Sequence, residues 1–268
     1  LGEIKPPKKE EPRLIELKNV KGKVIVRFAP NPNGALTLGH SRQAFWNWYL
    51  TQQYKGEYIL RFDDTDPKNK VPLKEAYQWI QEDHKWLGIK PDKVIIQSER
   101  LNIYYKYAEK LIKQKHAYVC TCHPERKRLL SSKQKPCPCR STKDNLGEWK
   151  KLFGHYKEGE AVLRIKTDLD YKNPAVRDFP AFRIVDKSLH PLDKKSKVRP
   201  LLNFASAIDD HELKVTHIIR GIDLQVSDER QKYIYKYLKW KYPETVYNGK
   251  LLVSGIKSTT EASKLIKA

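Results

Sequence analysis

The sequence lacks methionine, long apolar runs and a secretory leader. Its 268 residues include no methionine, so we expect the chain to be a segment of a longer gene product. No apolar stretch approaches the roughly 20 residues that cross a bilayer, which excludes a membrane-spanning helix. Residues 1–11 are rich in Lys, Glu and Pro, which is atypical of a signal peptide. We therefore expect a soluble, cytoplasmic protein with no membrane partner.

Positively charged residues outnumber negatively charged ones in this sequence. The chain has 53 Lys and Arg against 32 Asp and Glu, for a formal net charge of +21. Such an excess favours a polyanion, most simply a nucleic acid, over a Lys-rich surface without a partner. An anionic membrane surface is the weaker alternative, because no basic amphipathic helix stands out. Hydrophobic residues (39%) and aromatic residues (10%) are frequent enough for a folded chain with a sizeable core.

Short β-rich runs alternate with helical stripes in the first hundred residues. Residues 24–28 and 58–62 are candidate buried strands, and helical patterns follow them at 40–54 and 73–87. This alternation is typical of a doubly wound α/β sheet. A further helix is predicted at 98–116 from its apolar stripe.

The α/β rhythm breaks near Tyr118. Residues 118–200 contain all four cysteines, many Pro and Lys residues, and short β-like runs such as 161–166. The pattern then resumes with an apolar stretch, a strand at 216–220 and a helix at 228–240. We therefore predict an α/β domain split by an inserted α+β domain. The expected division is a tail or linker at 1–22, the first half of the α/β domain at 23–97, the insertion at 98–200 and the second half at 201–268.

The stretch from Asn33 to His40 joins the first predicted strand to the first predicted helix. Ligands bind at this edge of α/β sheets. Gly34 and Gly39 permit close approach of a phosphate, and a helix N-terminus offers free N–H groups. His40 can donate to a phosphate oxygen as charge develops. A turn followed by a helix cap is the alternative interpretation of the same residues.

A longer pattern around this loop carries a family resemblance. The run Arg-Phe-Ala-Pro-Asn-Pro-Asn-Gly begins at Arg27 and leads into Thr37-Leu38-Gly39-His40. It resembles the first signature of the glutamyl- and glutaminyl-tRNA synthetases of class I, particularly the archaeal type. The family's His-Ile-Gly-His motif has a hydroxyl here, Thr37, in place of its first histidine. Ordered matches continue at 60–67, 178–184 and 209–221.

The resemblance implies a Rossmann-like catalytic domain whose insertion binds the acceptor stem of tRNA. It implies that ATP, with Mg²⁺, activates L-glutamate to glutamyl-adenylate, and that the glutamyl group then moves to the 3′-terminal ribose of tRNA. Thr37 and His40 are the expected catalytic residues of the first signature. The expected ATP-binding residues are Asn31, Pro32, Asn33, Gly34, Gly39, His40, Gly221, Lys250 and Leu251.

The resemblance also implies a pocket for the amino acid. Asp63 matches the family's acid for the α-ammonium, and Arg27 matches an arginine at the carboxylate end. Those residue types suit those groups. An acidic turn or a Mg²⁺ site is the alternative for Asp63 and its acidic neighbours. Leu202 and Ser206 stand at pocket positions where relatives often have tyrosine and asparagine or histidine.

Arg220 bears on which amino acid is chosen. In glutamyl enzymes an arginine here faces the side-chain carboxylate of the substrate, whereas glutaminyl enzymes have a small uncharged residue. A buried guanidinium that faces a neutral amide lacks a charge partner, which costs several kcal/mol. Arg220 therefore favours glutamate, and a structural ion pair is the alternative interpretation.

A lysine for the pyrophosphate leaving group is expected near the C-terminus. In the family's second signature, Lys-Met-Ser-Lys-Ser, the second lysine stabilises pyrophosphate. Residues 256–264 contain a degenerate version, and Ser263-Lys264 aligns with its end. Lys264 is therefore the first candidate and Lys257 the second, while an ordinary solvated loop is the alternative.

The cysteines form two close pairs, Cys120 with Cys122 and Cys137 with Cys139. Without a secretory signal, two such pairs favour zinc over disulfides. One residue separates each pair, where two are usual in zinc sites. Related glutamyl enzymes carry zinc at this place, and the alternatives are four reduced thiols or His123 as a substitute ligand. Nearby basic residues are expected to contact acceptor-stem phosphates: Arg126, Lys127, Arg128, Lys133, Lys135 and Arg140.

Three other functions remain open from the sequence. A glutaminyl-tRNA synthetase is disfavoured by Arg220, and a paralogue that glutamylates a tRNA base is disfavoured by the archaeal-type signatures. A non-catalytic, zinc-bearing RNA-binding module would use the basic patch alone. That module would not require Arg27, Asp63, His40 and Arg220 in one chain. The sequence does not indicate an oligomeric state.

Overall fold

The computed structural model of the protein describes residues 16–249. A parallel sheet is formed by β1 (Ile25–Phe28), β2 (Glu57–Phe62) and β3 (Lys93–Ile96), with β2 in the centre. A second parallel pair joins β8 (His217–Gly221) to β9 (Glu244–Asn248). Thr216 donates its backbone N–H to Ile25 O at 2.9 Å, which places β8 beside β1. The strands therefore follow the spatial order β3, β2, β1, β8, β9.

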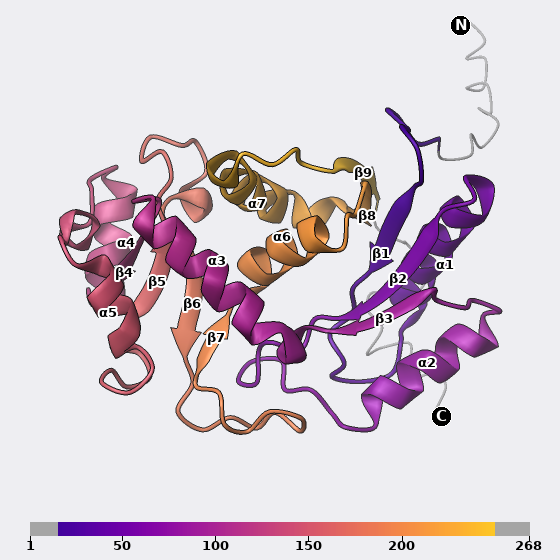
Figure 1. Ribbon diagram of the computed structural model, residues 1–268, viewed down its shortest axis with the longest axis horizontal. Helices are drawn as coiled ribbons and strands as arrows, with labels where there is room; N and C mark the ends of the chain where they lie inside the picture. The colour runs from indigo at the N-terminus through magenta and orange to yellow at the C-terminus, as the bar shows by residue number, and fades with distance from the viewer. Residues whose placement is uncertain (1–15, 250–268) are drawn as a thin grey trace, which may run out of the picture.

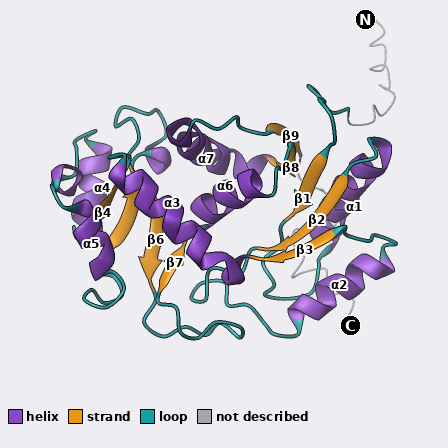
Figure 2. Cartoon of the chain, viewed as in Figure 1, coloured by secondary structure: helices purple, strands orange, loops and turns teal. Residues whose placement is uncertain are grey.

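Helices cover the two faces of this sheet (Figures 1 and 2). The connections within the first half of the chain contain α1 (Leu38–Gln53) and α2 (Ala76–Trp86). The second half contributes α6 (Leu202–Glu212) and α7 (Gln225–Leu238), which lie on the other side, toward the rest of the molecule. Parallel strands need such crossover connections, and the helices bury both faces of the sheet.

An antiparallel sheet interrupts the parallel one in sequence, between β3 and β8. Its strands are β4 (Ala117–Cys120), β5 (Val162–Ile165), β6 (Pro180–Ile184) and β7 (Val198–Pro200), in that spatial order. The accompanying helices are α3 (Leu101–Lys113), α4 (Pro124–Ser132) and α5 (Asn145–Lys151). Short 3₁₀ turns complete the described elements: η1 (Gln97–Arg100), η2 (Pro138–Ser141), η3 (Pro174–Val176) and η4 (Ile222–Leu224).

Two large apolar cores hold these layers. One joins the antiparallel sheet to α3, α5, α6 and α7 through large side chains such as Trp149, Phe182 and Phe204. The other packs α1 and α2 against one face of β1 and β2, where Val26 and Leu60 are fully buried. Because α6 and α7 belong to the first core, the two sheets are linked through these helices.

The parallel α/β sheet predicted from the sequence is confirmed, with some boundaries corrected. The strands expected at 24–28, 58–62 and 216–220 correspond to β1, β2 and β8. The apolar stretch that begins at 201 is helix α6, whereas β3 and β9 had no clear sequence signal. In residues 16–249, no helix combines the length and apolar content that crossing a bilayer would need.

Candidate functional site

Charged side chains lie on the face of β1 and β2 opposite the apolar core. Successive side chains of a strand point to opposite faces. Val26 and Phe28 therefore join the core with α1, while Arg27 points to the other face. Arg61 does the same in β2 and is 0% exposed. A buried guanidinium of this kind requires carboxylate partners.

Arg61 is the centre of a network of buried ion pairs. Its Nε and Nη2 donate to the two oxygens of Asp63, at 2.7 and 3.3 Å. Its Nη1 donates to Asp210 Oδ1 at 2.6 Å. Arg27 uses Nε and Nη2 for a bidentate pair with Asp210, at 3.0 and 3.1 Å. Ser206 Oγ lies 3.2 Å from both Asp63 Oδ2 and Arg61 Nη2. Ser206 and Asp210, on α6, therefore face the two arginines of the sheet.

The two acids in this network have pKa values shifted in opposite directions. Although burial lowers it, the pKa of Arg61 is held well above its usual value by Asp63, Asp210 and Asp209. Burial opposes ionisation of Asp210 too, yet Arg27 and Arg61 lower its pKa to about 2. For Asp63, burial outweighs Arg61 and raises the pKa. Of these carboxylates, Asp63 is thus the one whose ionised form would be stabilised most by a further cation, such as an ammonium group.

A second acid on α6 connects the network to the start of α3. Asp209 accepts hydrogen bonds from Arg100 Nε at 2.8 Å, Tyr104 OH at 2.7 Å and Gln97 Nε2 at 3.0 Å. Its carboxylate also lies 4.0 Å from Arg61 Nε. Adjacent acids on one helix therefore have different hydrogen-bond partners: Asp210 accepts from the arginines of the sheet, and Asp209 accepts from side chains of η1 and α3.

Arg220, at the end of β8, lies in a second buried ion pair. Its Nη1 donates to Asp228 Oδ1 at 2.6 Å. Asp228 also accepts hydrogen bonds from the hydroxyls of Tyr242 and Tyr247. Burial and the nearby charge of Arg27 lower the pKa of Arg220. Among residues 16–249, Arg220 Nε is buried without a hydrogen-bond partner. The ion pair that was an alternative for Arg220 is therefore present, but it engages only part of the guanidinium.

The loop after β1 brings the first signature beside this cluster. Asn31 Nδ2 donates to Asp63 O at 2.8 Å, which ties the loop to the end of β2. At the start of α1, the backbone N–H of Thr37 donates to His40 Nδ1 at 3.4 Å, and Thr37 Oγ1 lies 3.3 Å from the same atom. Because Nδ1 accepts from a backbone N–H, the ring proton of a neutral His40 lies on Nε2. A Cβ added at Gly34 would meet no atom within 4 Å, so the loop has open space there.

Several predicted site residues lie elsewhere. Leu202 begins α6 and is 44% exposed, outside the charged cluster. Gly221 ends β8, where a Cβ would come within 2.4 Å of Asp223 Oδ1, so a larger residue would require Asp223 to move. Four expected residues lie outside those that the structure describes: Lys250, Leu251, Lys257 and Lys264.

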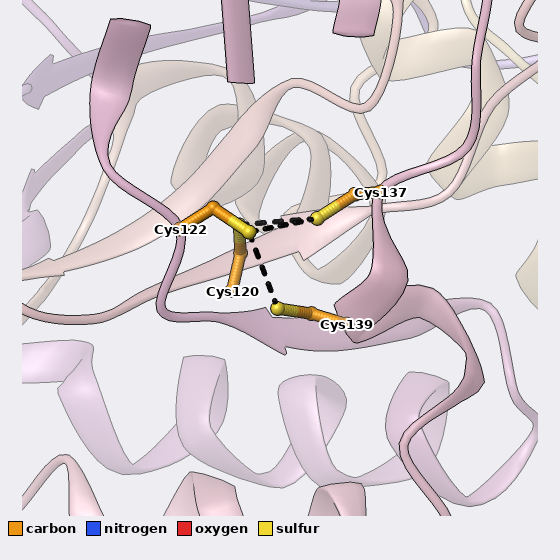
Figure 3. Close-up of side chains that lie close together, drawn as sticks. All are labelled: Cys120, Cys122, Cys137 and Cys139. Carbon is orange, nitrogen blue, oxygen red and sulfur yellow. Dashed lines mark hydrogen bonds between the residues drawn. The ribbon is translucent and has the colours of Figure 1, made fainter. Parts of the chain in front are cut away.

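The four cysteines converge on one point (Figure 3). Cys122 Sγ lies 3.5 Å from Cys137 Sγ and 3.7 Å from Cys139 Sγ, and Cys120 Sγ lies 3.6 Å from Cys137 Sγ. All four sulfurs lie within 4.8 Å of one another. A tetrahedron of thiolates at about 2.3 Å from zinc has edges of about 3.8 Å. The donor set and its spacing therefore fit a Zn²⁺ ion. His123, the alternative ligand, is exposed and faces Glu125 at 3.9 Å.

The basic residues around the cysteines divide into two groups. Four of them are exposed on the surface: Arg126, Arg128, Lys133 and Lys135. Lys127 is instead 4% exposed, with Nζ 3.6 Å from Asp178 Oδ2. Arg140 is half-buried and lies at the same distance, 3.6 Å, from this oxygen. The structure therefore places Lys127 inside the protein, which corrects its expected position on an RNA-binding surface.

The residues that complete the charged cluster had no role assigned from the sequence. They are Arg61, Asp209, Asp210, Asp228, Tyr242 and Tyr247. One signal was available: an arginine inside the apolar run of β2 implies a buried carboxylate partner. The run itself does not reveal which carboxylate that is.

Known proteins share both the sequence and the fold of this chain. The chain is 56% identical to the glutamate–tRNA ligase of Pyrococcus horikoshii, over 88% of this chain and 42% of the relative. It is 48% identical to the glutamate–tRNA ligase of Methanocaldococcus jannaschii, over 98% of this chain and 47% of the relative. The chain thus spans less than half the length of these curated relatives.

The fold resembles a solved structure of a glutamate tRNA ligase from Elizabethkingia meningosepticum in complex with its amino acid. The TM-score is 0.68 at 24% sequence identity, with 90% of this chain and 53% of that chain covered. A family model described as tRNA synthetases class I (E and Q), catalytic domain, matches residues 23–261. The chain therefore belongs to the class I tRNA synthetases for glutamate and glutamine, of which it contains the catalytic domain.

Proposed function

We propose that this chain is the part of a glutamate–tRNA ligase that activates L-glutamate and receives the acceptor end of tRNA. Relatives that are 56% and 48% identical to this chain over the aligned residues carry that name. In the proposed first step, an oxygen of the glutamate α-carboxylate attacks the α-phosphorus of Mg²⁺-bound ATP, and pyrophosphate leaves. In the second step, the 2′-hydroxyl of the terminal tRNA ribose takes the glutamyl group, and AMP leaves. The protein contributes mainly positioning and charge stabilisation.

The observation that best supports glutamate is the incomplete pairing of Arg220. A buried N–H without an acceptor costs roughly 1–3 kcal/mol, and Arg220 Nε is such a group in the described chain. Arg27 lies close enough to lower the pKa of Arg220. A carboxylate bound there would satisfy the free N–H and offset the repulsion of the two cations. A neutral amide would satisfy only the hydrogen bond.

The other groups of glutamate have candidate partners in the charged cluster, and ATP has candidate partners in the loop beside it. Asp63, whose pKa is raised by burial, would hold the α-ammonium, with Ser206 beside it. Arg27 still has Nη1 free of the Asp210 pair and would face the carboxylate end. The loop with Asn31, Gly34, Gly39 and His40 would bind ATP, and His40 Nε2 would donate to a phosphate oxygen. Lys264, or else Lys257, would stabilise the leaving pyrophosphate.

The antiparallel sheet and its helices would bind the tRNA acceptor stem. We take residues 98–200 as this inserted domain, between catalytic halves at 23–97 and 201–268. Exposed Arg126, Arg128, Lys133 and Lys135 supply positive charge on it, which suits contacts with the phosphates of an RNA helix. A cytoplasmic location accords with a role in translation.

We also propose that Cys120, Cys122, Cys137 and Cys139 bind one structural zinc ion. Four thiolate ligands leave no open position for a substrate, so the ion would hold the end of β4 to η2 rather than take part in catalysis. Metal analysis of the purified protein tests this. About one zinc per chain, lost in Cys137→Ser, is expected, whereas a metal-free, folded protein would contradict it.

Pyrophosphate exchange by the full-length protein tests the function. We expect exchange with glutamate but not with glutamine, measured with and without tRNA. Arg220→Ala should raise the KM for glutamate by roughly a hundredfold, because a charge-assisted contact is lost, while the KM for ATP changes little. Arg230→Ala is the matched control, since it removes a guanidinium that donates to Ala175 O instead.

Two results would contradict the proposal. Absence of exchange under every condition would exclude the activation step. Equal effects of Arg220→Ala on the KM values for glutamate and ATP would refute the role of Arg220 in selecting the amino acid.

A further inference from the structure

We propose that Asp228 is a positioning residue that orients Arg220 and thereby sets the affinity for the side-chain carboxylate of the amino acid. The proposal rests on the proposed function, because it assigns a determinant of selectivity to the same site. Neither the sequence motifs nor the family resemblance assigned a role to Asp228.

The carboxylate of Asp228 is held rigidly. It is 1% exposed and receives three donors: Arg220 Nη1, Tyr242 OH and Tyr247 OH. These donors come from the end of β8, the segment before β9, and β9 itself. Asp228 also lies in the first turn of α7, where the partial positive charge of a helix N-terminus stabilises a carboxylate. A side chain fixed from several directions can in turn fix the guanidinium it contacts.

Arg27 and Arg220 differ in which side of the guanidinium group contacts a carboxylate of the protein. Nε and Nη2 form one edge of an arginine and suit bidentate contact with a carboxylate. Arg27 uses this edge for Asp210. Asp228 contacts Arg220 through Nη1, on the opposite side of the group, and leaves Nε buried without a partner in the described residues. Asp228 therefore anchors Arg220 without using the bidentate edge, which in the proposed function contacts the ligand carboxylate.

Asp228 also changes the charge that the pocket presents. Arg27 and Arg220 repel each other, and Asp228 offsets part of that repulsion next to Arg220. Loss of the carboxylate would leave two buried cations that both interact with Asp210. The guanidinium of Arg220 would then be expected to turn away from Arg27 or toward Asp210, and in either case the free edge would be displaced.

Steady-state exchange kinetics of the full-length protein test this role. Asp228→Ala should raise the KM for glutamate roughly tenfold or more, the effect of losing a hydrogen bond to a charged group. The KM for ATP should change less than about twofold. Asp228→Asn keeps an acceptor for Arg220 and should show a smaller rise. Tyr247→Phe removes one donor to Asp228 and should show the smallest rise. This graded order distinguishes positioning from loss of the fold.

Glu229→Gln is the matched control. It removes a negative charge from the next residue of α7, whose carboxylate makes no ion pair with Arg220 in residues 16–249. Its kinetics should equal those of the wild type. A glutamate KM within twofold of wild type in Asp228→Ala would overturn the inference, as would parallel rises in the KM values for glutamate and ATP. A wild-type protein inactive with glutamate would refute the proposed function itself, which is a separate outcome.

Discussion

The two faces of β1 and β2 are built from alternate residues of the same strands but are stabilised differently. On one face, Val26, Phe28, Leu60 and Phe62 pack against α1 and α2. On the other, the arginines of β1 and β2 pair with carboxylates from α6 and from the end of β2. One pair of strands thus provides both an apolar core and a network of buried ion pairs.

This difference shows what each kind of contact contributes. Complete burial of a large apolar side chain stabilises a fold by roughly 1.5–3 kcal/mol, with little demand on direction. A buried ion pair loses several kcal/mol of hydration for each ion and recovers it only in a good geometry. The charged face is therefore a weak source of stability. Its bidentate contacts fix orientation instead, as Arg61 does for Asp63.

The largest expected effect comes from substituting Arg61. Arg61→Met should lower the free energy of unfolding by about 3–5 kcal/mol, because Asp63 loses its cation and Asp210 loses one of two. Glutamate-dependent exchange by the folded protein should also fall at least roughly a hundredfold. Urea unfolding and exchange kinetics at temperatures where the variant is folded measure the two effects separately.

Leu60→Ala is the comparison variant, since Leu60 is the preceding residue of β2 and faces the apolar core. It should cost about 2–5 kcal/mol of stability, with exchange by the folded protein within a few-fold of wild type. If Leu60→Ala impaired exchange as much as Arg61→Met, the separation between the two faces would not hold.

Sequence patterns predicted the apolar face better than the charged one. Buried strands are recognised from local β-rich runs, and β1, β2 and β8 were found in that way. The partners of Arg61 could not be found locally, because Asp210 is 149 residues away in the chain. Both acids at 209 and 210 belonged to a recognised motif, but only the packing of α6 decides that Asp210 faces the sheet and Asp209 faces α3.

The candidate site, too, was predicted only in part from local sequence patterns. The motifs named Arg27, Asp63, Ser206 and Arg220, and the fold brings all four to the charged face of the sheet or the end of β8. The burial of Lys127 beneath an otherwise exposed basic group could not be predicted, because its charge alone resembles that of its neighbours. Whether a lysine faces solvent or a buried acid depends on helix rotation, which a short basic run does not specify.

A smaller effect is expected from pH, which acts on the charged face through the carboxyl group of Asp210. The pKa of Asp210, about 2 in the folded protein, lies below the value near 3.9 of an unfolded aspartate. Its ionisation therefore contributes about 2 kcal/mol of stability above pH ~4, which is lost as pH falls toward ~2. Asp63 has a raised pKa and acts in the opposite direction, so the acid response of the whole protein is a mixture of both.

The variant Asp210→Asn isolates that contribution. It should be less stable than wild type at pH ~6, and the difference in unfolding free energy should narrow by about 2 kcal/mol as pH falls to ~2, because the wild-type carboxyl then becomes neutral too. Leu60→Ala should keep a constant difference from wild type over the same range, since no titrating group is removed. Urea unfolding at each pH measures both differences. A constant difference for Asp210→Asn would mean that Arg27 and Arg61 do not stabilise the ionised carboxylate, and the charged face would then be held mainly by hydrogen bonds.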